Sequence, residues 1–364
     1  MAPVIDECSR RGDLVEPIVC LSGQHRELLA PVAEYFGIRA HVELGLMTSA
    51  QTLAGLTARC VEAIDETIAR FQPDCVVVQG DTTTAMSAAL AAFYRRVPLV
   101  HVEAGLRTGN LAAPWPEELN RRVTGMVAVL HCAPTQRAAD ALLAEGAPAE
   151  SVHVTGNTVI DALLTTLSRE QANAAHWQQR YPMLSDRPMV LITGHRRESF
   201  GEGFENICRA IGALAERFPD HAFVYPVHLN PSVQEPVHRL LGARENVHLV
   251  DPAAYPEFVW LMDRSTLILT DSGGVQEEAP TLRKPVLVMR DTTERPEAVE
   301  AGAARLVGTS AENIVSHATQ LLTDPAAYAA CQIDWNPYGD GRASERIVER
   351  MIEQGWHLPQ NRKT

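Results

Sequence analysis

The 364-residue chain lacks the features that mark several classes of protein. Its seven cysteines are scattered and none form a C-x-x-C pair, so neither a disulfide framework nor a zinc knuckle is indicated. This cysteine usage fits a reducing cytoplasm, where we predict the protein to be located. No apolar run approaches the ~18 residues of a membrane span. The first residues, MAPVIDECSRRGD, carry charge too early for a signal peptide.

Positive charge is also scarce. The net charge is −13 and the pI about 5.5, so a general electrostatic affinity for nucleic acid or for anionic membranes is not expected. An anion site would need positive charge concentrated locally. The motifs H-E-x-x-H, Walker A, G-x-S-x-G and G-x-G-x-x-G are absent. The stretch GEGFEN begins like the last of these but lacks its third glycine, so a nicotinamide site is poorly supported.

What the sequence does contain is an alternation of short β-branched runs with longer helical patterns. The runs read as strands buried on both faces, and they are VEPIVCLSG (15–23), CVVVQGD (75–81), PLVHVEAG (98–105), MVLITGH (189–195), HAFVYPVH (221–228), NVHLVDP (246–252), TLILTDSGG (266–274) and KPVLVMRD (284–291). Repeated βα units predict an α/β fold of parallel sheets with helices on both sides. The units form two series, in domains 1–165 and 188–340, joined by a helix and linker over 166–187.

This alternation directs attention to the residues that follow each strand. In open α/β sheets, ligands bind beyond the carboxyl ends of the strands. Five positions qualify there, namely Asp81, Glu103, His195, His228 and the DSGG stretch at 271–274.

The carboxylates after the first strands each allow two interpretations. Asp81 stands at a strand-to-helix turn, where it is either a helix N-cap or, if Thr82 takes the cap, available for chemistry. Glu103 ends the next strand, and a carboxylate there needs a cationic partner or a function. Glu117 and Arg121 are four residues apart, so on a helix they share a face and form either an ordinary ion pair or part of a site.

The second series carries the positive charge. His195, Arg196 and Arg197 follow a strand directly, which is more typical of an anion site than of three structural side chains. The DSGG stretch runs from a strand into a helix, so we expect the backbone N–H groups of residues 272–274 to face a phosphate.

Two further features belong to the same stretch. Glu277 and Glu278 either complement the helix dipole or accept hydrogen bonds from a ribose. Arg295 follows another strand, where it is well placed for a phosphate oxygen.

Seven long motifs together resemble one family. They are GDTTTAMSAALAAFYRRVPLVHVEAGLRTG, PWPEELNRR, TGNTVIDALL, TGHRRESFGEGFENI, YPVHLNP, LTDSGGVQEEAP and VMRDTTERPEAVEAGAARLVGT. In this order they resemble the bacterial non-hydrolysing UDP-N-acetylglucosamine 2-epimerases, from about residue 2 to the final helix. The resemblance implies two Rossmann-like domains facing a central cleft, as in the GT-B glycosyltransferases. It also implies a homodimer, no metal and no other cofactor. The final segment, 341–364, is expected to pack on the N-terminal domain.

The implied reaction is the reversible conversion of UDP-N-acetylglucosamine to UDP-N-acetylmannosamine, which feeds surface polysaccharide synthesis. Breakage of the C1–O bond to UDP makes the C2 proton removable and gives 2-acetamidoglucal, and UDP then returns with a proton delivered to the other face. This scheme needs acid/base groups within about 3 Å of the protons on both faces of C2. It also needs cations on the departing diphosphate.

The resemblance assigns roles to residues as follows. The catalytic set is Asp81, Glu103, Glu117, Arg121 and His195, the histidine acting either in catalysis or on the diphosphate. The diphosphate would be held by Ser272, Gly273, Gly274 and Arg295, the ribose by Glu278, and the uracil would lie by Phe258. Positions that match a second, regulatory substrate site are Gln24, His25, Gln51, Glu118, Arg196 and His228.

The sequence departs from the family at its start. The family opens with a strand and a Gly-Thr-Arg-Pro-Glu loop ahead of a segment like MAPVI, and this sequence begins at that segment. Loss of a central parallel strand would expose the edges of its neighbours. We therefore expect weaker activity or stability than in a chain extended by that strand and loop, to be checked by comparing the turnover and melting temperature of the two.

Three other functions are compatible with the same residues. A GT-B glycosyltransferase would pass the sugar to an acceptor, and a hydrolysing epimerase would release free N-acetylmannosamine. A catalytically silent UDP-sugar sensor would bind its ligand without exchanging the C2 proton. Asp81, Glu103 and Glu117, all present in their motifs, favour the epimerase over the sensor.

Overall fold

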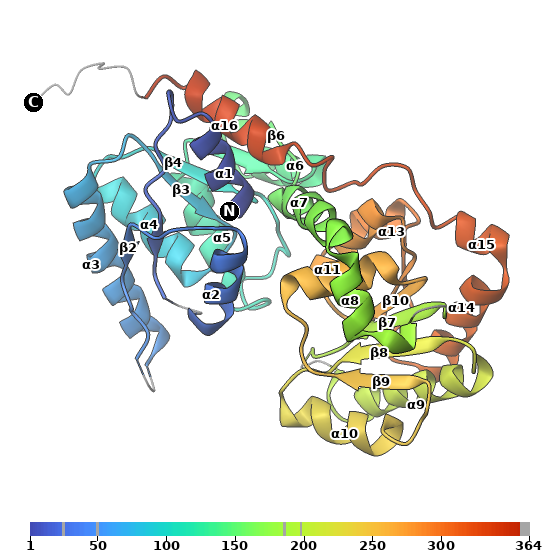
Figure 1. Cartoon of the computed structure of the whole chain (residues 1–364). Coiled ribbons are helices and arrows are strands. Elements are labelled where there is room, and N and C mark those ends of the chain that lie inside the picture. Colours follow the sequence, from blue (N-terminus) through green and yellow to red (C-terminus); the bar gives the residue numbers. More distant parts are fainter. Residues whose placement is uncertain (24–25, 49–50, 185–186, 197–198, 357–364) are drawn as a thin grey trace, which may run out of the picture. The chain divides into compact units, whose positions relative to one another are not determined.

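The structure is a computed structural model that describes residues 1–23, 26–48, 51–184, 187–196 and 199–356 (Figure 1). The chain divides into two compact units, one of residues 1–162 with 338–364 and the other of residues 163–337. The first division falls inside helix α7, Thr158–Ala172. Gln24 and His25, predicted for a second substrate site, lie outside the described residues.

The first unit is built on two parallel sheets. Strands β1 and β2 form a two-stranded sheet, and strands β3, β4, β5 and β6 form a four-stranded sheet in that order. The bounds are β1 Cys20–Leu21, β2 Val42–Glu43, β3 Val76–Gln79, β4 Leu99–Val102, β5 Leu130–Ala133 and β6 Val152–Val154. Every strand pairing is parallel. Carboxyl ends of β3 and β4 therefore lie at the same edge of the sheet, which places Asp81 and Glu103 near one another.

Helices cover both faces of the four-stranded sheet. The helices of this unit are α1 Ala2–Arg10, α2 Arg26–Tyr35, α3 Leu53–Phe71, α4 Thr83–Tyr94, α5 Glu117–Val127, α6 Gln136–Ala144, η1 Ala149–Ser151, the start of α7, and α16 Ala343–Glu353. Alternate strand residues divide between two cores. Val78 and Leu99 pack with α3 and α4, whereas Val100 and Val102 pack with α1 and α16. The two-residue period of a strand produces this division.

Helix α3 shows how the sequence encodes one of these faces. Its buried residues, Leu56, Cys60, Ile64 and Ile68, recur every four positions and so form one stripe. The hydroxyl of Thr52 accepts a hydrogen bond from the Gly55 N–H at 3.1 Å and caps the first turn. The facing helix α4 presents small side chains, namely Ala85, Ala88, Ala89, Ala91 and Ala92, which allow close approach.

The second unit contains one six-stranded parallel sheet, in the order β12-β11-β10-β7-β8-β9. Its strands are β7 Met189–Thr193, β8 Ala222–Pro226, β9 Val247–Val250, β10 Leu267–Thr270, β11 Val286–Val288 and β12 Ala304–Leu306. Its helices are α8 Ala174–Arg180, η2 Pro182–Leu184, α9 Glu202–Arg217, α10 Pro231–Leu241, α11 Tyr255–Arg264, α12 Gly273–Glu278, η4 Ala279–Leu282, α13 Pro296–Glu300, α14 Ala311–Thr323 and α15 Pro325–Ala329.

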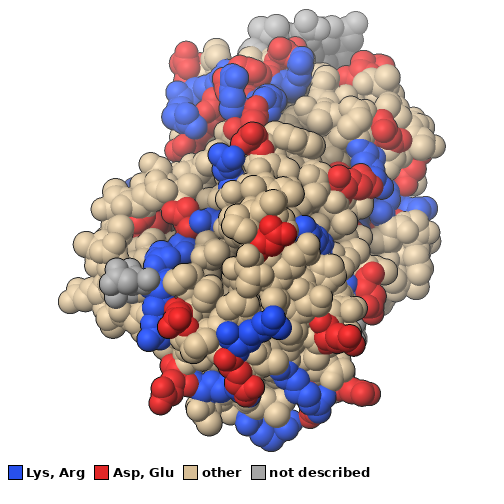
Figure 2. Space-filling model, turned by 90° about the vertical axis from the view of Figure 1, so that its right-hand side faces the viewer, with Lys and Arg blue, Asp and Glu red and all other residues tan. Residues whose placement is uncertain are grey.

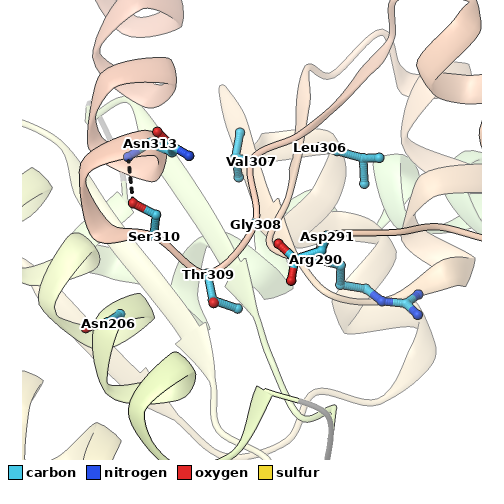
Figure 3. Close-up of a pocket in the computed structure, with 9 residues that line it drawn as sticks. All are labelled: Asn206, Arg290, Asp291, Leu306, Val307, Gly308, Thr309, Ser310 and Asn313. Atoms are coloured by element: carbon cyan, nitrogen blue, oxygen red, sulfur yellow. Dashed lines mark hydrogen bonds between the residues drawn. The ribbon is translucent and has the colours of Figure 1, made fainter.

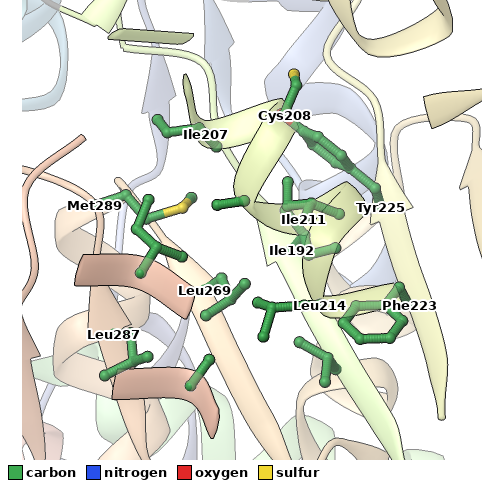
Figure 4. Close-up of a cluster of buried hydrophobic side chains, with 14 of the residues drawn as sticks. Ile192, Ile207, Cys208, Ile211, Leu214, Phe223, Tyr225, Leu269, Leu287 and Met289 are labelled. Carbon is green, nitrogen blue, oxygen red and sulfur yellow. The ribbon is translucent and has the colours of Figure 1, made fainter. Parts of the chain in front are cut away.

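A large apolar cluster fixes one face of this sheet. Ile192, Phe223, Leu269 and Leu287 of the strands form one cluster with side chains of the covering helices, such as Leu214 of α9 (Figure 4). All five are fully buried. The order β10-β7-β8 at the centre of the sheet sets the turns after these strands side by side, and the predicted anion-binding residues lie on two of these turns.

The fold class predicted from the sequence is confirmed, because both units are parallel α/β structures with helices on the faces of their sheets. All eight predicted strand runs contain a strand, although VEPIVCLSG contributes just Cys20 and Leu21. The segment 341–364 contains helix α16, which packs on α1, with Arg11 bonded to Glu349 at 3.3 Å.

The charged surface agrees with the low positive charge of the sequence. Figure 2 shows basic and acidic side chains interspersed on the face that it presents. Several surface arginines of the second unit pair with carboxylates, for example Arg239 with Glu205 at 2.8 Å and with Glu235 at 2.7 Å. Within the described part of the chain, no helix is both long and apolar enough to cross a bilayer.

Candidate active site

The turn between β3 and α4 leaves Asp81 available for chemistry. Thr82 is the N-cap of α4, and its hydroxyl accepts a hydrogen bond from the Ala85 N–H at 3.2 Å. The glycine before Asp81, Gly80, has a φ of +69°, a conformation that favours glycine. Of the two interpretations of Asp81, the capping one is therefore wrong.

Helix α5 holds Asp81 in place. Arg121 approaches the Oδ2 atom of Asp81 with Nε at 2.9 Å and with a terminal nitrogen at 2.7 Å. The neighbouring Asn120 donates from Nδ2 to the Asp81 carbonyl at 2.8 Å. Arg121 also pairs with Glu118 at 3.3 Å, and Glu117 is not among its ion-pair partners in the described structure. The i, i+4 pair of Glu117 with Arg121 is thus not formed, and Glu117 opens the helix half-exposed.

Glu103 occupies an unusual backbone conformation at the end of β4. Its φ is +59°, a left-handed value that costs a non-glycine residue about 1–2 kcal/mol. Its Oε2 atom accepts a hydrogen bond from Gln79 Nε2 at 3.1 Å. Arg107, four residues later in the chain, pairs with Glu145 at 2.8 Å. Such strain is often retained at functional sites, where the rest of the structure compensates for it.

Two buried histidines lie behind these carboxylates, on β4 and β5. His101 and His131 are paired in register, and burial lowers the pKa of each to about 4, so both are neutral at physiological pH. His101 Nε2 lies 2.9 Å from the carbonyl oxygen of Gly80, so Nε2 carries the hydrogen and donates it. Sequence reasoning missed His101, because its position inside an apolar run looked like core.

Glu118 is a buried acceptor that organises the loop before α5. It is fully buried, and its two oxygens accept the backbone N–H groups of Thr108 and Gly109 at 3.1 and 3.2 Å. Arg121 and Arg122 lie beside it at 3.3 and 3.5 Å.

Gln51, which is also predicted for a second substrate site, lies just before α3. It accepts a hydrogen bond from Arg59 of that helix.

In the second unit, the DSGG stretch forms the turn from β10 into α12. The N–H of Ser272 donates to Thr270 Oγ1 at 2.9 Å, so this group already has an acceptor inside the turn, and its contact with a diphosphate stays a prediction. The N–H groups of Gly273 and Gly274 belong to the first turn of α12 and have no acceptor within the helix. Two of the three predicted backbone donors, those of Gly273 and Gly274, therefore lie at the N-terminal end of a helix.

Two guanidinium groups border this turn. A Cβ atom placed on Gly273 would lie 3.6 Å from the Arg295 guanidinium and 3.8 Å from that of Arg196. Arg295 is held by Glu277, whose Oε1 atom lies 2.6 Å from its Nε. The hydroxyl of Thr293 donates to Gln276 Oε1 at 2.6 Å and ties the same loop to α12. Positive charge is thus concentrated beside glycine backbone, as an anion site requires.

Glu278 ends α12 in a buried position next to α11. The hydroxyl of Tyr255 donates to its Oε1 atom at 2.8 Å, and Phe258 follows one turn later on the same face, half-exposed. Burial raises the pKa of Glu278 to about 7, against the opposing effect of the Tyr255 hydrogen bond. Glu278 and Phe258 therefore belong to neighbouring elements, as a site for a nucleoside requires.

His195 lies after β7 and stacks on His228, with ring centroids 5.4 Å apart and an interplanar angle of 13°. The backbone N–H of Asn230 donates to His228 Nδ1 at 3.1 Å, which leaves the hydrogen of a neutral His228 on Nε2. The pKa of His195 is lowered, mainly by burial and also by His228 and Arg196, against the opposing charge of Asp271.

A separate pocket of about 510 Å³ lies at the loops that follow β11 and β12 (Figure 3). Its lining consists of Asn206, Arg290, Asp291, Leu306, Val307, Gly308, Thr309, Ser310 and Asn313. None of the predicted site residues is among them. Arg290, the one basic residue of this lining, is paired with Glu294 at 2.9 Å, whereas two arginines border the Gly273 turn. Across the described residues, no three His, Cys, Asp or Glu side chains gather as metal ligands would.

Comparison with known proteins decides the family. The model of the family described as UDP-N-acetylglucosamine 2-epimerase matches residues 6–352. The chain belongs to the UDP-N-acetylglucosamine 2-epimerase family. A curated relative named UDP-N-acetylglucosamine 2-epimerase from Escherichia coli strain K12 is 50% identical over 355 residues, which cover 96% of this chain and 94% of the relative. A probable UDP-N-acetylglucosamine 2-epimerase from Ralstonia nicotianae is 56% identical over 92% of this chain and 90% of its own.

The fold agrees with this family. The crystal structure of the UDP-GlcNAc 2-epimerase from Neisseria meningitidis bound to UDP-GlcNAc matches with a TM-score of 0.91. The two chains are 47% identical, and the match covers 97% of this chain and 96% of the other. The resemblance identified from the seven motifs is confirmed, and so is the GT-B-like fold class that it implied.

Proposed function

We propose that this epimerase-family chain catalyses the reversible C2 epimerisation of UDP-N-acetylglucosamine to UDP-N-acetylmannosamine. The observation that carries the proposal is the division of chemistry between the two units. Asp81 and Glu103 supply carboxylates after β3 and β4 of one unit, and Glu117 supplies a third at the start of α5. The Gly273 turn of the other unit supplies cations for a diphosphate. A carbon acid and a departing anion need these two kinds of group.

The proposed reaction begins at the diphosphate. Arg196, Arg295 and the N–H groups of Gly273 and Gly274 would stabilise the charge that develops as the C1–O bond to UDP breaks. One carboxylate of the set Asp81, Glu103 and Glu117 would remove the C2 proton as the bond breaks, giving 2-acetamidoglucal. A second acid/base group would deliver a proton to the opposite face as UDP adds back to C1, which restores the sugar nucleotide with C2 inverted.

The remaining substrate contacts follow the same division. Glu278 would accept hydrogen bonds from the ribose, and Phe258 would lie against the uracil. His195 would act in catalysis or on the diphosphate. We propose that the two compact units correspond to the predicted domains 1–165 and 188–340 with the segment 341–364 on the first. The binding partners would then be UDP-N-acetylglucosamine and UDP-N-acetylmannosamine.

We also propose that the protein is a cytoplasmic homodimer. All seven cysteines are free thiols, which fits a reducing compartment. Large apolar side chains stay exposed near the ends of α4 and α5, which pack on one another, namely Phe93 (62% exposed), Tyr94 (66%) and Met126 (86%). An apolar surface of this kind supports association with a second copy of the chain. Sedimentation of the purified protein would measure the oligomeric state.

A regulatory substrate site that includes Gln24, His25, Gln51, Glu118, Arg196 and His228 remains a prediction. Because both oxygens of Glu118 already accept hydrogen bonds from the protein, a direct contact with a ligand would have to replace one of them. Sigmoidal dependence of turnover on UDP-N-acetylglucosamine, abolished in Gln51→Ala, would support the regulatory site.

The decisive test of the proposed function is incubation with UDP-N-acetylglucosamine alone in deuterium oxide, followed by proton NMR at C2. Epimerisation predicts deuterium at C2 and the appearance of UDP-N-acetylmannosamine without free sugar. Free N-acetylmannosamine would indicate a hydrolysing enzyme instead. Binding without exchange would indicate a glycosyltransferase or a sensor. Glu117→Gln should abolish the exchange, whereas the exposed Glu150→Gln, a matched substitution in the same unit, should not.

A further inference from the structure

A buried aspartate after β10 has no role in the reaction proposed so far. Asp271 follows Thr270, which pairs in register with Thr193 of β7, and the Asp271 N–H donates to the Thr193 carbonyl at 3.2 Å. Its side chain is fully buried. This pairing places Asp271 beside the turn that carries His195.

The carboxylate of Asp271 organises the backbone of that turn. Its Oδ2 atom accepts the N–H groups of His195 at 2.7 Å and of Arg196 at 2.8 Å. On the other side, the buried hydroxyl of Tyr225 donates to the carbonyl of Gly194 at 3.0 Å. Three consecutive residues are therefore fixed by two buried side chains, one of which, Tyr225, is part of the apolar cluster of Figure 4.

The second oxygen of this carboxylate faces the imidazole of His195. Oδ1 is buried, makes no hydrogen bond to any residue that the structure describes, and lies 3.4 Å from His195 Nδ1. A buried carboxylate oxygen without a donor is costly, and the imidazole N–H is the group positioned to supply one. The His195 side chain is 42% exposed, so part of the ring is accessible to solvent while Nδ1 faces the buried carboxylate.

We propose that Asp271 is a positioning residue for His195, holding the imidazole through Nδ1–H so that Nε2 is the nitrogen presented to the substrate. The role of Asp271 in turnover rests on the proposed function, since His195 is assigned to the substrate there. The hydrogen on Nδ1 and its acceptor follow from the geometry of this unit alone. Carboxylate–histidine pairs of this kind fix both the tautomer and the orientation of an imidazole.

The charges around His195 give the pair a second effect. His228 stacks on one side of the ring and Arg196 is the next residue, and both disfavour a protonated imidazole, as burial does. Asp271 opposes these three effects and favours the protonated form. Without its charge, the pKa of His195 would fall further below the usual value for histidine.

The substitution Asp271→Asn separates these roles from the backbone contacts. The amide oxygen of asparagine can still accept the N–H groups of His195 and Arg196. Its NH2 group would then face His195 Nδ1, which must become an acceptor and transfer its hydrogen to Nε2. The turn would keep its backbone bonds while the imidazole presents the opposite tautomer.

The first measurement needs no variant and no activity. In the wild-type protein with ¹⁵N-labelled histidine, long-range ¹H–¹⁵N correlation spectra above the pKa of His195 should show the neutral ring with its hydrogen on Nδ1. Comparison with a His195→Gln sample assigns the signals. A neutral wild-type ring protonated on Nε2 would overturn the proposal, whatever the protein catalyses.

The second measurement uses Asp271→Asn. We expect the Nε2–H tautomer, a fall in kcat of about 10²- to 10⁴-fold, and a shift to lower pH of the limb of the pH profile that His195 controls. UDP binding by calorimetry confirms that the second unit is folded. The control is Asp251→Asn, because Asp251 follows the strand β9 of the same sheet and is exposed. It should match the wild type.

The outcomes distinguish this proposal from the proposed function. An unchanged tautomer and pH profile in a folded, UDP-binding Asp271→Asn protein would show that Asp271 acts on the backbone alone. If the wild type gives the Nδ1–H tautomer but exchanges no C2 proton, the pair is established and the epimerase function fails.

Discussion

Glu103 shows at the scale of one residue how the site conflicts with local stability. Its left-handed φ of +59° costs a glutamate energy that a glycine would not incur, and the carboxylate held by Gln79 gives a reason for retaining it. The strain belongs to the backbone and not to the carboxylate. Two substitutions that both remove the carboxylate should therefore differ in stability.

We predict that Glu103→Gly is more stable than Glu103→Ala by about 1 kcal/mol, because alanine keeps the strained conformation and glycine does not. Both should lose turnover, since neither has a carboxylate. Urea unfolding measures the stabilities. An alanine variant as stable as the glycine variant would mean that the left-handed conformation is not strained in this protein.

Glu278 predicts a pH dependence of stability. Its pKa is raised from 4.5 to about 7 by burial, so between these values the folded state holds a proton that the unfolded state has released. The contribution of Glu278 to stability is therefore largest below about pH 4.5 and is lost as the pH rises through about 7.

Glu278→Gln should remove this dependence. At pH 8 the variant should be more stable than the wild type by up to about 3 kcal/mol, from about 1.4 kcal/mol per pKa unit, and the difference should vanish near pH 4.5. Guanidinium unfolding across this range measures it. Glu312→Gln, at an exposed position of α14, should show no such trend. A constant difference at every pH would contradict the raised pKa.

The role of a residue could be predicted from the sequence where the local backbone conformation determines it. It could not be predicted where a long side chain can reach several ion-pair partners. From the sequence, either Asp81 or Thr82 could cap helix α4. The turn after β3 makes Thr82 the cap. Arg107 lies four residues after Glu103 but reaches Glu145, 38 residues further on. Such a partner depends on tertiary structure, which residue spacing does not encode.

At the scale of elements, the loop before α5 depends on Glu118. This buried carboxylate accepts two backbone N–H groups and lies beside two arginines. One of these arginines, Arg121, also pairs with Asp81. We predict that Glu118→Gln lowers the free energy of unfolding by about 3 kcal/mol, because a buried charge that accepts two backbone N–H groups and one of the two carboxylates that pair with Arg121 is lost.

Hydrogen exchange should locate this effect. The amides of Thr108 and Gly109 should exchange faster in Glu118→Gln, because one acceptor becomes a donor. Glu117→Gln, one residue earlier and half-exposed, should leave their protection unchanged. Equal exchange in the two variants would show that the loop is held by other contacts.

The same scale separates the elements that were predictable from those that were not. Strands with three or four consecutive apolar residues, such as β10 and β7, were found from the sequence. Strands β5, β6 and β12 were missed, and in each of them a polar residue, His131, His153 or Arg305, separates the apolar ones. Helix α1 was missed as well, since its apolar face is defined by contact with α16.

At the scale of the whole molecule, each unit has its own apolar core, and the sequence order does not reveal this division completely. Residues 338–364 return to the first unit after 175 residues of the second. The N-cap residue of helix α16, Arg342, makes no side-chain capping bond. Asp161 of α7 supplies one instead, accepting the N–H of Ala343 at 3.1 Å and of Ser344 at 2.7 Å.

Asp161→Ala should therefore destabilise the first unit alone. Loss of buried hydrogen bonds to a charged group predicts a decrease of about 3 kcal/mol, and calorimetry should show one transition moved to lower temperature while another stays in place. UDP affinity should be retained, because the residues proposed to hold UDP lie in residues 163–337. Asp140→Ala, at an exposed position of α6, is the control for the loss of a carboxylate in the same unit. If Asp161→Ala also lost UDP binding in native buffer, the second unit would depend on the first for its fold. The two units would then not unfold independently.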